Sequence, residues 1–109
     1  MSCLFCKIAS KEIASSVVFE TDNILAFDDI SPQAPVHVVV IPKRHVELIN
    51  DLEDLSEEML DAVARVARLK GADITGYRTV VNQGRDAGQA VPHLHFHVLG
   101  GRAMHWPPG

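Results

Sequence analysis

The stretch VPHLHFHVLGG, residues 91–101, carries a histidine at every second position. Alternate side chains of a β-strand share a face, so His93, His95 and His97 are predicted to point the same way from a strand at about residues 93–99. Leu94 and Phe96 then point the opposite way, into a core. Alternate residues of a strand lie roughly 6.5–7 Å apart, so neighbouring imidazoles can share one small ligand. The stretch therefore predicts one strand with a core face and a chemically active face.

Three interpretations of this histidine face are open. A solvated face explains it poorly, because histidine is uncommon and an exposed strand does not require it three times in a row. A zinc site is the second interpretation, since neutral imidazole is a standard zinc ligand. Phosphate chemistry is the third, because one imidazole can act as nucleophile and another as general acid near neutral pH. Glycines in the preceding loop, at Gly84 and Gly88, favour the third by offering N–H groups to an anion.

The rest of the chain predicts an α+β fold. Strands are expected at residues 16–21, 23–29, 36–41 and 77–82, and helices at residues 3–10 and 55–70. The helix at 55–70 is predicted from apolar residues at helical spacing, with Ser56 as its N-cap and Gly71 as its stop. Strands and helices do not alternate regularly, which favours an antiparallel sheet with helices beside it.

Composition limits the class of protein. The chain has 109 residues, 47% of them hydrophobic and 22% charged, which predicts a single soluble domain spanning residues 1–109. A net charge of −4 argues against nucleic-acid binding. No apolar run suggests a membrane span, and the first residues do not resemble a signal peptide, so a cytoplasmic location with reduced cysteines is expected.

Several segments together resemble the histidine-triad (HIT) superfamily. They are HLHFHVLGG (93–101), FDDISPQAPVHVVVIPKRH (27–45), GYRTVVNQG (76–84) and GGRAMHWPPG (100–109), and the last three are similar to the histidine-triad nucleotide-binding (Hint) branch. The resemblance implies a HIT-like fold: a five-stranded antiparallel sheet, one main helix and a short N-terminal helix. It also implies a homodimer in which the two sheets join.

The resemblance also implies an activity. Hint proteins bind purine nucleotides such as AMP and GMP and hydrolyse purine nucleoside phosphoramidates, in which AMP is joined to an amine. Matched to the family, His95 is the nucleophile that forms a nucleotidyl-histidine intermediate. His97 contacts the phosphate or the leaving group, His37 orients or tunes the row, and His93 is either a relay partner or a metal ligand. No cofactor is expected to be required for catalysis.

The nucleotide-binding residues follow from the same resemblance. Asp29 matches the acid that binds the ribose hydroxyls, and Trp106 matches a C-terminal tryptophan that approaches the neighbouring subunit's pocket. The base walls are matched by Phe5, Ile8, Phe27, Ile30 and Val39, and the phosphate side by Asn82, Gly88, Gln89 and Ala90. Ala90 departs from the family, which commonly has a serine there to donate to the leaving group.

Cys3 and Cys6 have the Cys-x-x-Cys spacing of half a zinc site. Some bacterial HIT proteins complete such a site with two histidines, which here match His45 and His93. A Cys2His2 structural zinc is one expectation, and two reduced thiols on a short helix are the other.

Two alternative functions are kept. One is a dinucleoside polyphosphate hydrolase or nucleotidyl transferase of a related HIT branch. The other is a non-catalytic nucleotide- or zinc-binding interaction module, for which Ala90 is the main argument.

Overall fold

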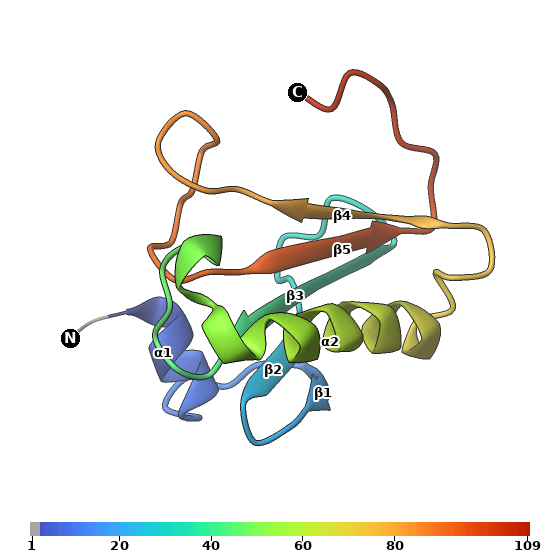
Figure 1. The fold of residues 1–109 in the computed structure, drawn as a ribbon. Helices are drawn as coiled ribbons and strands as arrows, with labels where there is room; N and C mark the ends of the chain where they lie inside the picture. Colours follow the sequence, from blue (N-terminus) through green and yellow to red (C-terminus); the bar gives the residue numbers. More distant parts are fainter. Residues whose placement is uncertain (1–2) are drawn as a thin grey trace.

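The fold, a computed structural model, is described for residues 3–109. In this part of the chain a five-stranded antiparallel sheet has the strand order β1-β2-β3-β5-β4 (Figure 1). The strands are β1 (Val17–Glu20), β2 (Ile24–Asp28), β3 (Val36–Pro42), β4 (Tyr77–Val81) and β5 (Phe96–Gly100). The helices are α1 (Leu4–Ala9), α2 (Ser56–Leu69) and the two 3-10 turns η1 (Ile49–Asp51) and η2 (Glu53–Leu55). The α+β class and the antiparallel sheet are confirmed.

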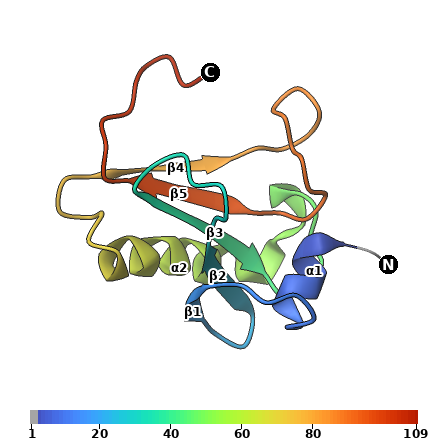
Figure 2. The same cartoon turned by 180° about the vertical axis from the view of Figure 1, so that it is seen from behind.

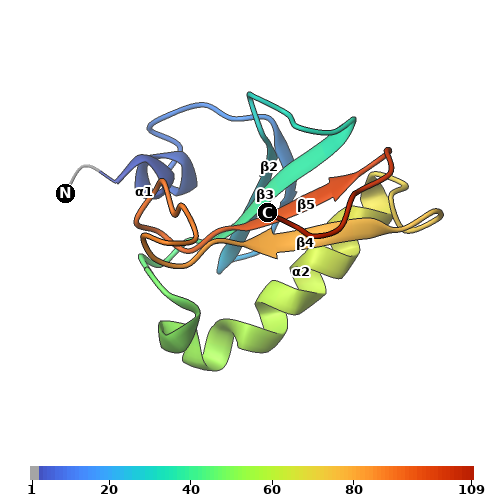
Figure 3. The same ribbon diagram turned by 90° about the horizontal axis from the view of Figure 1, so that it is seen from above.

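The two faces of the sheet are covered differently. Helix α2 lies across one face, whereas the much shorter α1 lies against the other, as opposite views show (Figures 1 and 2). On the α2 face Val38, Val40 and Val98 are completely buried against Met59 and Val66. Each such side chain contributes about 1.5–3 kcal/mol through burial. Seen from above, α2 runs below the strands while α1 stands at the end of the sheet (Figure 3).

The register of the strands assembles the other face. Phe27 of β2 lies opposite Val39 of β3, and Val39 lies opposite His97 of β5. Opposite residues of antiparallel neighbours point to the same side of the sheet, so these three side chains form one row. On this face Cys3, Phe5, Ile8, Leu25, Phe27, Val39 and Ile41 form a second, smaller core beneath α1. The sheet register therefore places an apolar surface beside a histidine.

Two expectations about local structure are wrong. Strand β5 begins at Phe96, so His93 and His95 precede it, and the N–H of His93 donates to the Val91 carbonyl in a turn. Alternation nevertheless holds, because Leu94 and Phe96 are buried in the α2 core. Ser56 is not the N-cap of α2: the η2 turn runs directly into the helix, and the Ser56 hydroxyl donates to the Glu53 carbonyl.

Gly71 ends α2 as expected, with a φ of 74° that suits glycine. Among residues 3–109, no helix has the length and apolar character needed to cross a bilayer.

Candidate functional site

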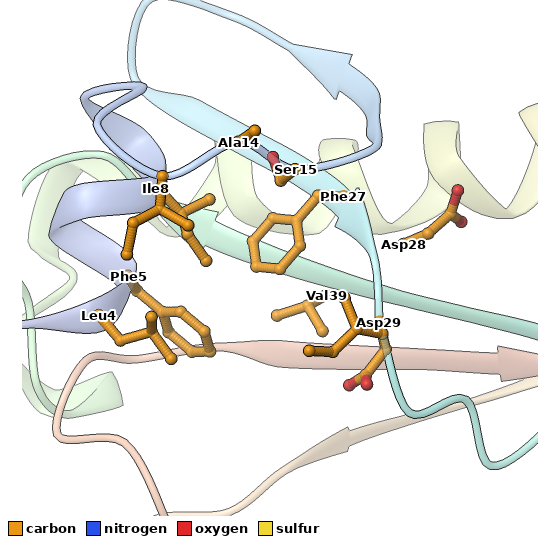
Figure 4. Close-up of a pocket in the computed structure, with 11 residues that line it drawn as sticks. Leu4, Phe5, Ile8, Ala14, Ser15, Phe27, Asp28, Asp29 and Val39 are labelled. Atoms are coloured by element: carbon orange, nitrogen blue, oxygen red, sulfur yellow. The ribbon is translucent and has the colours of Figure 1, made fainter.

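An apolar pocket of about 290 Å³ opens between α1, β2 and β3 (Figure 4). Its walls include Phe5 and Ile8 from α1, Phe27 from β2 and Val39 from β3, all of which are buried. Phe5 and Phe27 meet edge to face, with ring centroids 5.8 Å apart. The volume lies at the lower end of small-molecule pockets, which start at roughly 300 Å³. A pocket with such walls suits a flat aromatic ring.

Asp29 lies at one edge of this pocket, immediately after β2 (Figure 4). Its Oδ1 accepts a hydrogen bond from the Ser31 N–H at 2.8 Å, and its Oδ2 lies 3.4 Å from Nε2 of His37. Ile30 is among the residues that line the pocket, although it is fully exposed in this structure. Five further residues of the lining were not predicted from the sequence: Leu4, Ile13, Ala14, Ser15 and Asp28.

Beyond Asp29 a chain of hydrogen bonds links His37 and His97. The Gln33 N–H donates to Nδ1 of His37 at 3.0 Å, so a neutral His37 carries its proton on Nε2. That Nε2–H lies 2.9 Å from Nδ1 of His97 and donates to it. His97 then carries its own proton on Nε2. The network therefore assigns one tautomer to each imidazole and ends in an N–H donor on His97.

The surroundings of His97 keep it neutral. Burial, followed by the nearby imidazoles of His95 and His37, lowers its pKa to about 4, against a smaller opposing effect of Asp29. His97 is half-buried. At neutral pH it is thus a hydrogen-bond donor without a charge of its own.

His95 lies between the pocket and this chain. Its ring centroid is 4.9 Å from that of Phe5 and 5.1 Å from that of His97. Nδ1 lies 2.8 Å from the carbonyl oxygen of His93, which can only accept, so Nδ1 carries the proton. Nε2 of His95 then bears the lone pair. An imidazole with one nitrogen held as a donor and the other left free beside a pocket is the arrangement that a nucleophile requires.

A second cluster joins the N-terminal segment to the start of the histidine stretch. Ligand atoms of Cys3, Cys6, His45 and His93 all lie within 4.8 Å of one another. Nδ1 of His93 is 3.4 Å from the Cys3 sulfur and 3.5 Å from the Cys6 sulfur, and Nδ1 of His45 is 3.2 Å from the Cys6 sulfur. The two cysteines form no disulfide.

The protonation of His93 fits a metal site. Its Nε2 donates to the Pro42 carbonyl at 2.7 Å, which leaves the Nδ1 lone pair directed at the two sulfurs. Burial lowers the pKa of His93, which favours the neutral, ligating form. Burial and the neighbouring Cys3 thiol raise the pKa of Cys6, an effect that a bound cation reverses. Two thiolates and two imidazoles are a donor set that zinc commonly takes.

The loop after β4 differs from expectation. The N–H groups of Gly84, Gly88 and Gln89 all donate within the loop, to Oε1 of Gln89, the Arg85 carbonyl and the Gly84 carbonyl. The Gln89 side-chain amide donates to the Glu47 and Val91 carbonyls. These hydrogen bonds stabilise the loop. In this conformation the three backbone N–H groups are therefore not directed at an anion.

The remaining expected site residues lie at the surface of this region. Ala90 is exposed and Asn82 is half-buried just after β4. Trp106 is 82% exposed in the C-terminal segment, which the Arg78 guanidinium holds by donating to the His105 carbonyl at 2.9 Å. Trp106 is not among the residues that line the pocket of its own chain.

Comparison with known proteins agrees with this geometry. Residues 10–104 match the family model of the HIT domain. The structure of a HIT family hydrolase from Legionella pneumophila Philadelphia 1 superposes with a TM-score of 0.93 at 52% identity, covering 99% of this chain and 100% of that one.

Two plant proteins are similar over 97% of this chain, each at 45% identity. One is the 14 kDa zinc-binding protein of Brassica juncea, of which 98% is covered, and the other is Adenylylsulfatase HINT1 of Arabidopsis thaliana, of which 76% is covered. The chain belongs to the histidine triad (HIT) family, in its Hint branch.

Proposed function

We propose that the protein binds purine nucleotides and hydrolyses nucleoside 5′-phosphoramidates of the AMP–amine type, with His95 as nucleophile. The observation that carries this proposal is the fixed tautomer of His95, whose Nδ1–H is held by the His93 carbonyl at 2.8 Å. Family membership and the hydrolase name of a relative at 52% identity support the reaction class.

The pocket suggests how a nucleotide binds. The base lies between the apolar side chains of Phe5, Ile8, Phe27 and Val39. Asp29 accepts hydrogen bonds from the ribose hydroxyls, since each carboxylate oxygen has a lone pair beyond its present contact. The α-phosphate then reaches His95 and His97. Nothing on the apolar walls discriminates adenine from guanine, so both purines are expected to bind.

The first step forms a bond from Nε2 of His95 to the α-phosphorus. The P–N bond breaks, its electron pair goes to nitrogen, and the amine leaves after its nitrogen takes one proton from solvent. His97 is the donor nearest to His95 in the network, and its Nε2–H donates a hydrogen bond to the phosphoryl oxygen on which negative charge develops. His97 stays neutral in this step, in keeping with its low pKa.

The second step hydrolyses the nucleotidyl-histidine. A water oxygen attacks phosphorus, the P–N bond to His95 breaks, and the electron pair returns to Nε2. The water proton passes to solvent, which balances the proton taken up in the first step, so the site is regenerated and AMP is released. His37 keeps the tautomer of His97 fixed throughout, because its Nδ1 is occupied by the Gln33 N–H.

We also propose that Cys3, Cys6, His45 and His93 hold a structural Zn²⁺. The mutual spacing of their ligand atoms and the tautomer of His93 support it, and a relative at 45% identity is named as zinc-binding. When bound, the metal supplies a cross-link between the N-terminal segment and the segments that carry the two histidines. It takes no part in the chemical steps.

A second substrate class is favoured by Ala90, which has no hydroxyl to protonate a leaving group. Sulfate leaves as an anion and needs no proton, whereas an amine does. The Arabidopsis relative is named an adenylylsulfatase. We therefore propose adenylyl sulfate as an alternative substrate, attacked by His95 in the same way.

We propose a homodimer as the working form. Strand β4 is at the edge of the sheet, and its outer backbone groups have no strand partner among the described residues. A second copy pairing along β4 would cover them and bring its C-terminal segment near the site. Sedimentation analysis is expected to give twice the mass of the chain, and a monomer at micromolar concentration would contradict the dimer.

The direct test mixes the purified protein with an AMP–amine phosphoramidate and measures AMP by chromatography. The wild type is expected to release AMP, and His95→Asn is expected to bind AMP without turnover. Adenylyl sulfate and a dinucleoside polyphosphate are assayed in parallel to rank the leaving groups. AMP binding with no hydrolysis of any of the three would favour the non-catalytic alternative.

A further inference from the structure

One residue connects the cysteine–histidine cluster with the nucleophile. The imidazole of His93 contacts the sulfurs of Cys3 and Cys6, whereas its backbone carbonyl accepts the Nδ1–H of His95. The side chain is 0% exposed. A shift of this side chain therefore moves the carbonyl that fixes the tautomer of His95.

The side chain is held on two sides. Nε2 donates to the Pro42 carbonyl at the end of β3, and Nδ1 is directed at the sulfurs. The first contact is made with the backbone of β3 and involves no atom of the cluster. The second depends on what occupies the cluster, because two thiols 3.4 and 3.5 Å away are weak partners for an imidazole.

Helix α1 provides a second connection. Phe5 lies between the two cysteines in sequence, and its ring meets His93 and His95 edge-on at 6.0 and 4.9 Å. A helix of six residues is too short to be stable by itself. Its position over the pocket therefore depends on packing and on the cluster that includes Cys3, its N-cap, and Cys6, within the helix.

We propose that metal occupancy of the Cys3, Cys6, His45 and His93 cluster controls the activity of His95, with His93 as the positioning residue. With Zn²⁺ bound, the His93 carbonyl and Phe5 hold the imidazole of His95 in the single tautomer that attacks phosphorus. Without metal, the protein keeps its sheet and its α2 core, but His95 samples both tautomers and turns over more slowly. The inference rests on the proposed function for its kinetic consequence alone.

The size of the expected loss in kcat follows from residues that orient metal ligands or reacting side chains in other proteins. Loss of a group that orients a ligand or a reacting side chain typically costs about 10–100-fold in activity. The expected loss falls mainly on kcat, because the apolar walls and Asp29, which bind the nucleotide, remain. KM is expected to change less than kcat.

The experiment uses His45→Asn as its main variant. His45 is exposed and touches Cys6, but no contact joins it to His95 among the described residues, so its removal affects the nucleophile only through the cluster. Cys6→Ser is the second variant. His105→Asn is the matched control, because His105 is an exposed histidine whose backbone alone makes a described contact.

Three quantities are measured for each protein with Zn²⁺ as the probe. They are zinc per chain, the ¹⁵N chemical shifts of the His95 imidazole, and kcat and KM for the phosphoramidate. We expect one zinc per chain in the wild type and His105→Asn, with His95 in the Nδ1–H form. We expect zinc loss, averaged His95 nitrogen shifts and a 10–100-fold lower kcat in His45→Asn and Cys6→Ser.

Chelation of the wild type should reproduce the variant spectrum, and added Zn²⁺ should restore kcat in the wild type only. A wild type that takes up no zinc overturns the inference. So does a zinc-free His45→Asn protein whose His95 shifts and kcat match the wild type. A zinc-loaded wild type without hydrolysis contradicts the proposed function instead, and the nitrogen shifts still decide whether the cluster positions His95.

Discussion

His93 and His97 stand four residues apart on the same side of the chain, yet their surroundings assign them to different kinds of site. Burial lowers the pKa of both, and a hydrogen bond fixes the tautomer of each. The free nitrogen of His93 is directed at two sulfurs, whereas the Nε2–H of His97 is left for the pocket side. Their partner atoms, and not their spacing, separate a metal ligand from a catalytic donor.

The role of His95 depends on both His93 and His97. His95 receives its tautomer from the backbone of His93 and its nearest donor from the side chain of His97. The comparison therefore predicts that damage at the His97 end stops chemistry, whereas damage at the His93 end affects the metal and the stability of the N-terminal segment first.

Removal of the His97 imidazole is expected to have the largest effect. His97→Asn should lower kcat for the phosphoramidate by about 10²–10³-fold, the usual contribution of one hydrogen-bond donor to charge that develops in the transition state. Zinc content should stay at the wild-type level, because His97 is not in the cysteine–histidine cluster. Steady-state kinetics with metal analysis checks both. A variant within threefold of the wild type would remove His97 from the mechanism.

Metal removal is expected to lower stability as well as kcat. A ligand at 100 times its dissociation constant stabilises the folded state by about 2.7 kcal/mol, so chelation should lower the melting temperature measurably. The same shift is expected in His97→Asn, because the two ends of the histidine stretch bind different partners. Scanning calorimetry with and without chelator measures it. An unchanged melting temperature in the wild type would count against the zinc site.

Ala90→Ser is expected to have a smaller effect, and in the favourable direction for amines. One added hydrogen bond is worth about 0.5–1.5 kcal/mol, which corresponds to a roughly 2–10-fold higher kcat/KM on the phosphoramidate. The exposed position accepts a hydroxyl without repacking. The rate on adenylyl sulfate should not change, since sulfate needs no proton. Equal gains on both substrates would contradict the proposed role of position 90.

The smallest expected effect is the pH dependence of stability at His97. Its folded pKa of about 4 lies below the ordinary value of 6.5, so the unfolded chain binds the proton first as pH falls. The contribution is therefore complete above pH 6.5 and is lost as pH falls towards 4. Urea unfolding at pH 7 and 4.5 should show a steeper loss in the wild type than in His97→Asn. Parallel losses would contradict the buried, neutral state of His97.

Much of the fold was predictable because local patterns agree with it. The valine-rich stretch of β3, the apolar spacing of α2 and the alternation around Leu94 and Phe96 each specified an element and its buried face. Ser56 was wrongly predicted to be the N-cap of α2. The preceding 3-10 turn continues into the helix, which removes the need for a side-chain cap. The start of β5 was predicted too early, because His93 lies in a turn that precedes the paired residues of the strand.

The site was predictable in its residue types but not in its connections. Spacing alone could not show that Gln33 directs the tautomer of His37, or that Pro42 directs that of His93, since both contacts use backbone atoms. Nor could it show that Gly88 and Gln89 are bonded within their own loop. Ile30 matched a family position but is fully exposed. Hydrogen bonds to backbone atoms cannot be predicted from the pattern of side chains in the sequence.

Trapping the covalent intermediate would show whether His95 is the nucleophile. The protein is mixed with the phosphoramidate, quenched within milliseconds under alkaline conditions that preserve phosphohistidine bonds, and analysed by intact-mass and peptide mass spectrometry. The account predicts a transient adduct of one nucleoside monophosphate located on His95, absent from His95→Asn and prolonged in His97→Asn. An adduct on another residue, or AMP release by His95→Asn at the wild-type rate, would contradict it.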